Sequence, residues 1–416
     1  MEYQITYIVL AAIFGGFMAW GIGANDVANA MATSVGSKAI TIKQAIIIAA
    51  IFEFAGAVLA GGEVTSTIRK GIISADSING SPDLLVFGML SSLLAAGIWL
   101  LLASKKGWPV STTHSIVGAV VGFAAVGIGT DAIHWSKVTN IVLSWIVTPM
   151  IAGIIAYMIF QSVHHLILKQ EDPLQKAKRF VPAYMFVTAF ILTLVTIKKG
   201  LKHVGLNFTD VQSYGLAVLL GIVVALIGGY FVSKVKPNPK KEKRFHFYTV
   251  EKVFAVLMVI TASGLAFAHG SNDVANAVGP VAAIITTAQS GIVASESALE
   301  SWVLLIGAVG IIVGLATFGV RVIRTVGQKI THLTPSRGFA AELAASSTIV
   351  VASGTGMPIS TTQTLVGAVL GVGMARGLTA IDLKVVRNIF ASWVVTIPAG
   401  ASLSIIFFFL FKFIFG

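Results

Sequence analysis

The stretch GANDVANA, from Gly23 to Ala30, occurs a second time with one change, as GSNDVANA from Gly270 to Ala277. Each copy of this Asn-Asp motif places two asparagines and an aspartate in a segment otherwise built from Ala, Val, Ile, Phe and Gly. A carboxylate is costly in such an apolar run, and it usually faces a cavity or marks an ion or substrate pathway. The alternative is a polar contact that joins two helices. Because the whole Asn-Asp-Asn set is repeated, we favour an ion or substrate pathway over a polar contact between helices.

The composition indicates the class of protein. Of the 416 residues, 56% are hydrophobic and only 11% are charged, and the mean hydropathy is +0.89. Such a chain cannot hide its apolar surface in a soluble core, so we expect an all-α polytopic membrane protein. The net charge of +12 does not indicate nucleic acid, because Lys and Arg sit in short loops where they orient the spans. Without cysteine there are no disulfides and no thiolate metal sites.

The apolar runs predict about twelve transmembrane segments in a lipid bilayer. The two runs that carry the Asn-Asp motif are long enough to be broken at it. The runs that begin at Trp108 and Met357 predict either crossings or, together with the run before each, helical hairpins that dip into the membrane.

The repeat extends beyond its first motif. WPVSTTHSIVGAVVG from Trp108 returns as MPISTTQTLVGAVLG from Met357, and NIVLSWIVT from Asn140 returns as NIFASWVVT from Asn388. Matched blocks in the same order, 247 to 249 residues apart, indicate duplicated halves. We therefore expect a first transmembrane repeat, an inserted pair of spans with charged loops, and a second repeat, at residues 1–161, 162–252 and 253–416.

The distribution of Lys and Arg predicts how the halves are oriented. If each half crosses the membrane about five times, most of the Lys and Arg residues fall on one side of it. With fewer crossings they are divided more evenly between the two sides. An odd number, followed by two inserted spans, makes the second half enter the membrane inverted. Inverted repeats with binding at the midplane are an architecture of secondary transporters. The loops 162–182 and 233–252 would then be cytoplasmic, and both termini extracellular.

A second motif is also duplicated, as PVSTT from Pro109 and PISTT from Pro358. In each P-x-STT motif a proline precedes three hydroxyl residues at the start of an apolar helix. Helix N-termini offer unpaired N–H groups and a positive dipole, which suit a tetrahedral oxyanion. The alternative is that the hydroxyls cap their own helix. Two copies in inverted halves would bring two helix ends together, which favours the anion site. Its candidate ligands are Ser111, Thr112, Thr113, Ser360, Thr361 and Thr362.

The Asn-Asp and P-x-STT motifs, in this order and in both halves, resemble those of the inorganic phosphate transporter (PiT) family. The resemblance implies cation-coupled symport of inorganic phosphate, with sodium as co-substrate, no other cofactor and no enzymatic activity. Sodium is a hard cation that suits carboxylate and amide oxygens. We expect it at Asp26, Asn29, Asp273 and Asn276, and phosphate at the six hydroxyl residues together with Asn25, Asn272, Glu53 and Glu342, the two glutamates matching those of the family pattern.

The second P-x-STT motif departs from the family pattern. The family commonly has His after it, whereas this chain has Gln363 there and His114 in the first copy. The departure argues against a proton relay through that position. His269, directly before the second Asn-Asp motif, is either a packing residue or a pore-lining donor.

Other functions stay open at this point. They are a proton-coupled phosphate or sulfate symporter, an anion channel, and a membrane enzyme acting on a phosphorylated lipid. Phosphate is favoured over sulfate because it keeps an O–H group near neutral pH, which an ionised carboxylate can accept. The sequence does not decide the coupling cation, the stoichiometry, the affinity or the oligomeric state, and a homodimer stays open.

Overall fold

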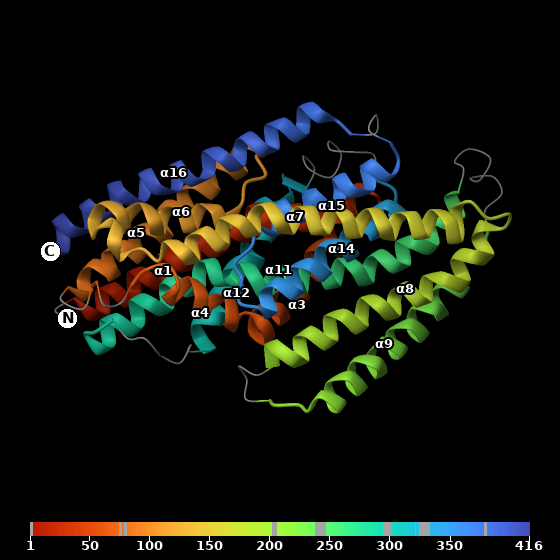
Figure 1. The fold of residues 1–416 in the computed structure, drawn as a ribbon, viewed down its shortest axis with the longest axis horizontal. Coiled ribbons are helices and arrows are strands. Elements are labelled where there is room, and N and C mark those ends of the chain that lie inside the picture. Colours follow the sequence, from red (N-terminus) through yellow and green to blue (C-terminus); the bar gives the residue numbers. More distant parts are fainter. Residues whose placement is uncertain are drawn as a thin grey trace.

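The chain folds as a bundle of long helices, shown as a computed structural model in Figure 1. The structure describes residues 3–74, 77–78, 81–201, 206–237, 247–293, 301–320, 322–323, 333–377 and 381–416. Among these residues every regular element is helical, apart from one isolated bridge between Ile73 and Ile133. Nine of the described helices are long and apolar enough to cross a membrane. The prediction of an all-α polytopic membrane protein is therefore confirmed.

Most elements are α-helices, and short π-helical or 3-10 turns (η) continue or join them. In chain order they are α1 Gln4–Ile22, η1 Gly23–Val27, α2 Ala28–Gly36, α3 Ile42–Ala60, α4 Gly62–Lys70, α5 Pro82–Lys106, α6 Thr112–Gly127, η2 Thr130–Ala132, α7 Trp135–Val163, η3 His164–Leu168, α8 Pro173–Val195, η4 Thr196–Gly200, α9 Asp210–Ser233, α11 Tyr248–Ser290, α12 Ser301–Gly314, η6 Leu315–Gly319, α14 Pro335–Gly354, α15 Thr361–Ala375 and α16 Leu383–Phe415.

The P-x-STT motifs lie at the turns of two helical hairpins, α5–α6 and α14–α15. Each turn contains a glycine in the left-handed region, Gly107 with φ 65° and Gly356 with φ 71°. The returning helices α6 and α15 have only 16 and 15 residues. At about 1.5 Å per residue they are shorter than a hydrocarbon core of about 30 Å. Among the described residues nine helices are long and apolar enough to be spans, fewer than the twelve expected. The runs that begin at Trp108 and Met357 are not among the nine, because each forms the short returning helix of a hairpin.

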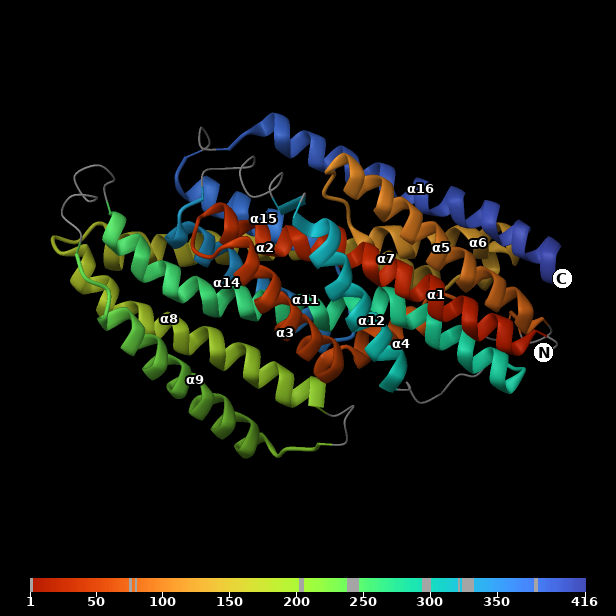
Figure 2. The same cartoon turned by 180° about the vertical axis from the view of Figure 1, so that it is seen from behind.

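The two hairpins enter the bundle from opposite ends. In Figures 1 and 2, α6 runs from the middle of the molecule toward the end that carries both termini, and α15 runs from the middle toward the other end. Their N-terminal ends therefore face each other near the centre. The turn between α7 and α8, the last residues of α9 and the first residues of α11 lie at the end opposite the termini (Figure 1).

The helix break expected at each Asn-Asp motif is wrong for the second copy. α11 runs without interruption through its motif for 43 residues. In the first copy the backbone widens into the π-helical turn η1 and then continues as α2. Asn25 and Asp26 of the first motif and Asn272 and Asp273 of the second instead bond to the hairpins, as described below. No interruption of the backbone is therefore needed to satisfy them.

The inserted spans α8 and α9 pack against each other, and α8 packs on α11. Figure 1 shows this pair along one side of the bundle. α11 also contacts α3, α5, α12 and α14, so it forms the centre of the fold. Its motif residues Asn272, Asp273 and Asn276 are completely buried.

Glycines allow the helices around the first motif to touch. A Cβ atom on Gly23 would lie 1.8 Å from the carbonyl oxygen of Ile311, and one on Gly314 would lie 1.9 Å from that of Trp20. The backbones of η1 and α12 are thus in direct contact, the packing that small residues permit between membrane helices.

Gly23→Ala is therefore expected to destabilise the protein, because the added methyl group would meet backbone that cannot rotate away. Overpacking of this kind costs about 1–3 kcal/mol or more. Thermal unfolding of the purified protein in detergent measures the effect. Gly215→Ala is the matched control, since no atom lies within 4 Å of its added Cβ. Equal melting temperatures for the two variants would show that η1 and α12 are not packed this closely.

Candidate functional site

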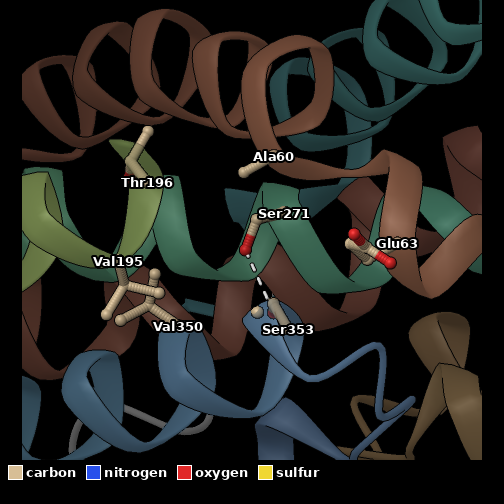
Figure 3. Close-up of a pocket in the computed structure, with 8 residues that line it drawn as sticks. Ala60, Glu63, Val195, Thr196, Ser271, Val350 and Ser353 are labelled. Atoms are coloured by element: carbon tan, nitrogen blue, oxygen red, sulfur yellow. Dashed lines mark hydrogen bonds between the residues drawn. The ribbon is translucent and has the colours of Figure 1, made fainter. Parts of the chain in front are cut away.

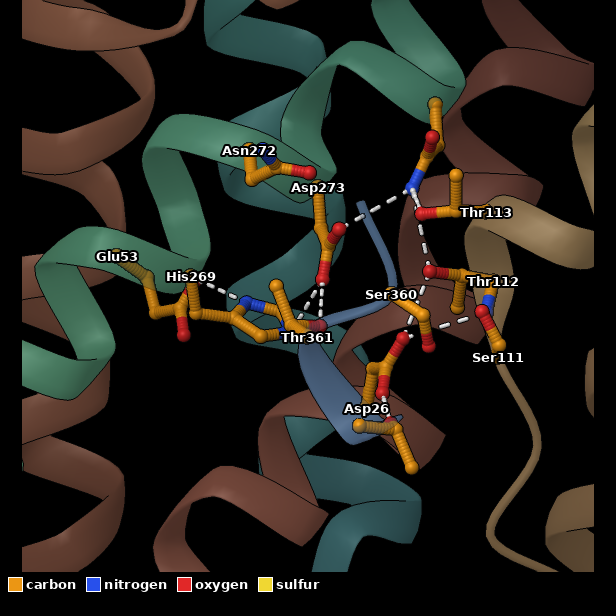
Figure 4. Close-up of polar contacts among 12 residues, drawn as sticks. Asp26, Glu53, Ser111, Thr112, Thr113, His269, Asn272, Asp273, Ser360 and Thr361 are labelled. Atoms are coloured by element: carbon orange, nitrogen blue, oxygen red, sulfur yellow. Dashed lines mark hydrogen bonds and ion pairs between the residues drawn. The ribbon is translucent and has the colours of Figure 1, made fainter. Parts of the chain in front are cut away.

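The N-terminal ends of α6 and α15 meet beside the two Asn-Asp motifs (Figure 4). The Thr113 hydroxyl donates across the junction to the carbonyl oxygen of Ile359, at 2.8 Å. Asp26 and Asp273 lie on either side of this junction and are 2% and 0% exposed. Segments from four distant parts of the chain thus enclose one polar centre.

Asp26 is bonded by both hairpins. The Thr112 hydroxyl donates to its Oδ2 atom at 2.7 Å, and the Thr112 backbone N–H donates to the same atom at 3.3 Å. From the other half, the Thr362 hydroxyl donates to Oδ1. The first half's aspartate therefore holds the two helix ends together.

Asp273 has the equivalent bond and further partners. The Thr361 hydroxyl donates to its Oδ2 atom at 2.5 Å, and the Asn276 amide donates to Oδ1 at 3.3 Å. The same amide also donates to the hydroxyls of Thr112 and Thr113, both at 3.2 Å. Asn276 thus joins the aspartate of its own half to the threonines of the other half.

His269 lies between two carboxylates. Its Nδ1 atom is 3.0 Å from Oε2 of Glu53, and its Nε2 atom is 2.8 Å from Oδ2 of Asp273. A neutral imidazole carries a single N–H. The Nδ1 contact is a hydrogen bond, whereas the Nε2 contact is a short ion-pair distance without a hydrogen bond, and only an imidazolium ion would present an N–H to both carboxylates.

The centre contains more acidic than basic side chains. Ionised Asp26, Asp273 and Glu53 contribute −3, and a charged His269 would leave −2. Buried charge is costly unless it is paired. Two acceptor oxygens, Oε1 of Glu53 and Oδ1 of Asn276, also lack a hydrogen-bond partner among the described residues. Oxygen atoms and unbalanced negative charge together suit cations.

Three of these side chains are close enough to share an ion. One ligand atom each from Asp26, His269 and Asp273 lies within 4.8 Å of the others. An alkali cation prefers the carboxylate oxygens of this set to the imidazole nitrogen, since it is a hard ion.

The first asparagine of each motif holds a hairpin turn. The Asn25 amide donates to the Ser104 hydroxyl at 3.1 Å and to the Trp108 carbonyl at 3.0 Å, and its oxygen accepts from the Val110 N–H at 3.2 Å. Asn272 makes the equivalent bonds in the second half, to the residues Ser353, Met357 and Ile359. Both expected phosphate ligands, Asn25 and Asn272, therefore use their amide groups in hydrogen bonds within the protein.

The sequence analysis missed Ser104 and Ser353, which accept these hydrogen bonds and lie 249 residues apart. Extending the repeated block that begins at Trp108 by a few residues toward the N-terminus would have found them.

The serines of the P-x-STT motifs cap their own helices. The Ser111 hydroxyl accepts from the His114 N–H and the Ser360 hydroxyl from the Gln363 N–H, both at 3.2 Å. In this structure Ser111 and Ser360 therefore act as helix caps, the alternative to anion binding that the sequence left open. The threonines that follow them point into the centre instead (Figure 4).

Glu342 is separate from the central group. Its Oε1 atom accepts from the hydroxyls of Thr33, at 2.7 Å, and Ser34, and its Oε2 atom accepts from Thr261 at 2.6 Å. None of its hydrogen bonds in the described structure goes to a P-x-STT residue. α14 thus places Glu342 against Thr33 and Ser34 of α2 and Thr261 of α11, and its expected role as a phosphate ligand stays a prediction. The side chain of Asn29, an expected cation ligand, lies outside the described residues.

A small cavity adjoins the Asn272 side of the centre. Its volume is about 10 Å³, and Glu63, Ser271 and Ser353 are among its lining residues (Figure 3). The Ser271 hydroxyl donates to that of Ser353 at 3.1 Å. A space of this size holds about one water molecule.

Known proteins resemble the chain over its whole length. It matches the model of the phosphate transporter family over residues 22–404. It is 54% identical to a putative phosphate permease of Haemophilus influenzae over 100% of this chain and 99% of that protein. It is 42% identical to the inorganic phosphate transporter 2-1, chloroplastic, of Arabidopsis thaliana, over 98% of this chain and 72% of that one. A solved structure, the sodium-dependent phosphate transporter, has a TM-score of 0.91 and 39% identity, and the match covers 98% of this chain and 100% of the other.

Proposed function

The chain belongs to the phosphate transporter family, and on this premise we propose that it is a symporter that moves inorganic phosphate with sodium by alternating access. It is a multi-pass membrane protein, and its relatives are transporters and permeases rather than enzymes. The observation that carries the proposal is the meeting of two helix N-termini at two buried aspartates. Helix ends suit an anion, and the aspartates suit cations.

Sodium is proposed to bind at Asp26 and Asp273, with amide oxygens from Asn276 and, by equivalence in the repeat, Asn29. The charge of the centre supports two monovalent cations, because they would balance the −2 left by three carboxylates and an imidazolium. Because the helices are not broken, side-chain oxygens rather than freed carbonyls supply the ligands of this proposal.

Phosphate is proposed to bind the hydroxyls of the P-x-STT threonines. In this structure three of them, on Thr112, Thr361 and Thr362, donate to the aspartates. A hydroxyl has only one hydrogen to donate. A cation on each carboxylate would compete for the same oxygen atoms and release these hydroxyls. Sodium would thus prepare the anion site, which couples the two substrates.

The two halves, residues 1–161 and 253–416, are proposed to be inverted repeats on either side of the inserted pair 162–252. The equivalent bonds of Asn25 and Asn272, and the hairpins that enter from opposite ends, support this arrangement. The Lys and Arg distribution supports cytoplasmic loops at 162–182 and 233–252 and extracellular termini. Both termini do lie at one end of the bundle (Figure 2).

Uptake into proteoliposomes tests the function. Labelled phosphate should accumulate above its outside concentration when sodium is higher outside, and should not when choline replaces sodium at fixed pH. Accumulation driven by a pH gradient alone would indicate proton coupling instead. Downhill flux without accumulation would indicate a channel, and labelled product would indicate an enzyme.

Competition tests the substrate. Unlabelled arsenate in excess should reduce the uptake of labelled phosphate and sulfate should not, because only arsenate keeps an O–H group that a carboxylate can accept. Equal inhibition by sulfate would remove the phosphate assignment.

A further inference from the structure

A groove on the surface of the bundle is lined by none of the residues of the central site. Its volume is about 570 Å³. Its walls are α9, α11 and the turn between α2 and α3, and every lining residue is apolar or glycine. They are Ala39, Val224, Ile227, Gly228, Phe231, Ala255, Val256, Val259 and Ile260. In a membrane protein such a groove is filled by apolar chains rather than by water.

Each wall of the groove ends in a lysine. On α9, the lining face from Val224 to Phe231 continues one helical turn later to Lys234, and on α11 the lining face begins one turn after Lys252. Lys38 directly precedes Ala39. All three lysines are exposed.

These lysines have no acidic partner among the described residues. The ammonium groups of Lys234 and Lys252 lie over the rings of Tyr230 and Tyr248, at 5.0 and 5.1 Å from the ring centres. The nearest carboxylate in sequence, Glu251, is bonded to the backbone N–H and hydroxyl of Ser336 at 2.7 and 2.8 Å. The mouth of the groove thus presents three positive charges that nothing in the described structure balances.

We propose that this groove binds an anionic phospholipid, with an acyl chain between α9 and α11 and the phosphate of the headgroup at Lys38, Lys234 and Lys252. An apolar slot with a basic mouth matches the two parts of such a molecule. Basic pockets between membrane helices bind anionic headgroups on the cytoplasmic side. α9 ends and α11 begins at the end opposite the termini (Figure 1), so Lys234 and Lys252, at these two helix ends, lie there.

A short chain of hydrogen bonds links the groove to Glu342, a buried carboxylate outside the central group. The N–H of Ala39, in the groove wall, donates to the carbonyl oxygen of Ser34 at 3.1 Å. The Ser34 hydroxyl in turn donates to the carboxylate of Glu342. An occupied groove would hold this turn, and with it the end of α2, in place.

Lipid retention by the purified full-length protein tests the site. The protein is equilibrated with equal amounts of dioleoyl phosphatidylglycerol and dioleoyl phosphatidylcholine, and the bound lipid is counted by native mass spectrometry. Phosphatidylglycerol should be retained about tenfold over phosphatidylcholine, because each lysine contributes attraction to an anionic lipid. In the triple variant Lys38→Gln, Lys234→Gln, Lys252→Gln the preference should disappear.

Two controls separate the headgroup from the groove. Lys137→Gln with Lys412→Gln removes exposed lysines elsewhere in the chain and should keep the preference. Val256→Trp fills the groove and should reduce retention of both lipids, whereas Leu226→Trp, on α9 but outside the groove, should not. Equal retention of the two lipids by the wild-type protein would overturn the proposal. So would a change from dimer to monomer in Val256→Trp, which would show that a second copy covers the groove.

Discussion

Asp273→Asn is expected to abolish sodium-dependent phosphate uptake. The substitution keeps the shape of the side chain but removes the charge that faces His269 at 2.8 Å and accepts from Thr361 at 2.5 Å. Removing one partner of a buried charged set costs about 3–5 kcal/mol. At 1.4 kcal/mol per tenfold, sodium affinity should fall by roughly 100-fold or more. Initial rates of uptake across a range of sodium concentrations measure the change.

Asp26→Asn should have an effect of the same size, because both hairpins donate to this carboxylate. Asp210→Asn is the matched control, since that side chain is 84% exposed and forms a surface ion pair with Lys198. It should leave the sodium dependence unchanged. Full sodium dependence in Asp26→Asn or Asp273→Asn would mean that the aspartates only fasten the helix ends, and the cation site would have to be sought elsewhere.

The central group could be predicted from the sequence because its members lie in repeated motifs. Asp26 and Asp273 stand at equivalent places, as do Thr112 and Thr361. An inverted duplication brings equivalent segments together at one axis, so the pairing of motifs follows from topology alone. The structure brings these four side chains together as that reasoning expects.

Residues outside the repeated motifs could not be placed in this way. His269 has Ile22 at the equivalent position of the first half, so the repeat gives it no partner. Its contact with Glu53 joins α11 to α3 and depends on helix packing that no local pattern encodes. Glu342 looked similar to Glu53, a lone carboxylate in an apolar run, yet α14 places it beside Thr33 and Thr261.

Some local sequence patterns are compatible with two different structures, and the sequence alone does not choose between them. A proline followed by hydroxyl residues predicts a helix start, but it does not tell a capping serine from one that binds a ligand. The broken helices were inferred from the length and polarity of the Asn-Asp runs. α11 remains continuous because Asn272 and Asp273 are satisfied by the hairpin rather than by their own backbone.

Thr112→Val and Thr361→Val should each weaken phosphate transport by a similar factor. Valine keeps the shape of threonine but has no hydroxyl. The loss of one buried donor costs about 1–3 kcal/mol, which corresponds to roughly 5- to 150-fold in the apparent KM for phosphate. The equal size is expected because each threonine donates to the aspartate of its own half, at 2.7 and 2.5 Å. Phosphate dependence of uptake at saturating sodium gives the KM.

The comparison that decides the role of these threonines uses two other variants. Thr188→Val removes a buried hydroxyl that donates to a carbonyl of its own helix, at 2.8 Å from the oxygen of Tyr184, far from the centre. It should leave KM unchanged. Ser111→Ala removes a helix cap and should lower the melting temperature, since a lost cap costs about 0.5–2 kcal/mol. If Thr112→Val behaves like Ser111→Ala, with a lower melting temperature and an unaltered KM, the threonines only stabilise the hairpin ends. A raised KM at an unaltered melting temperature places them on the substrate.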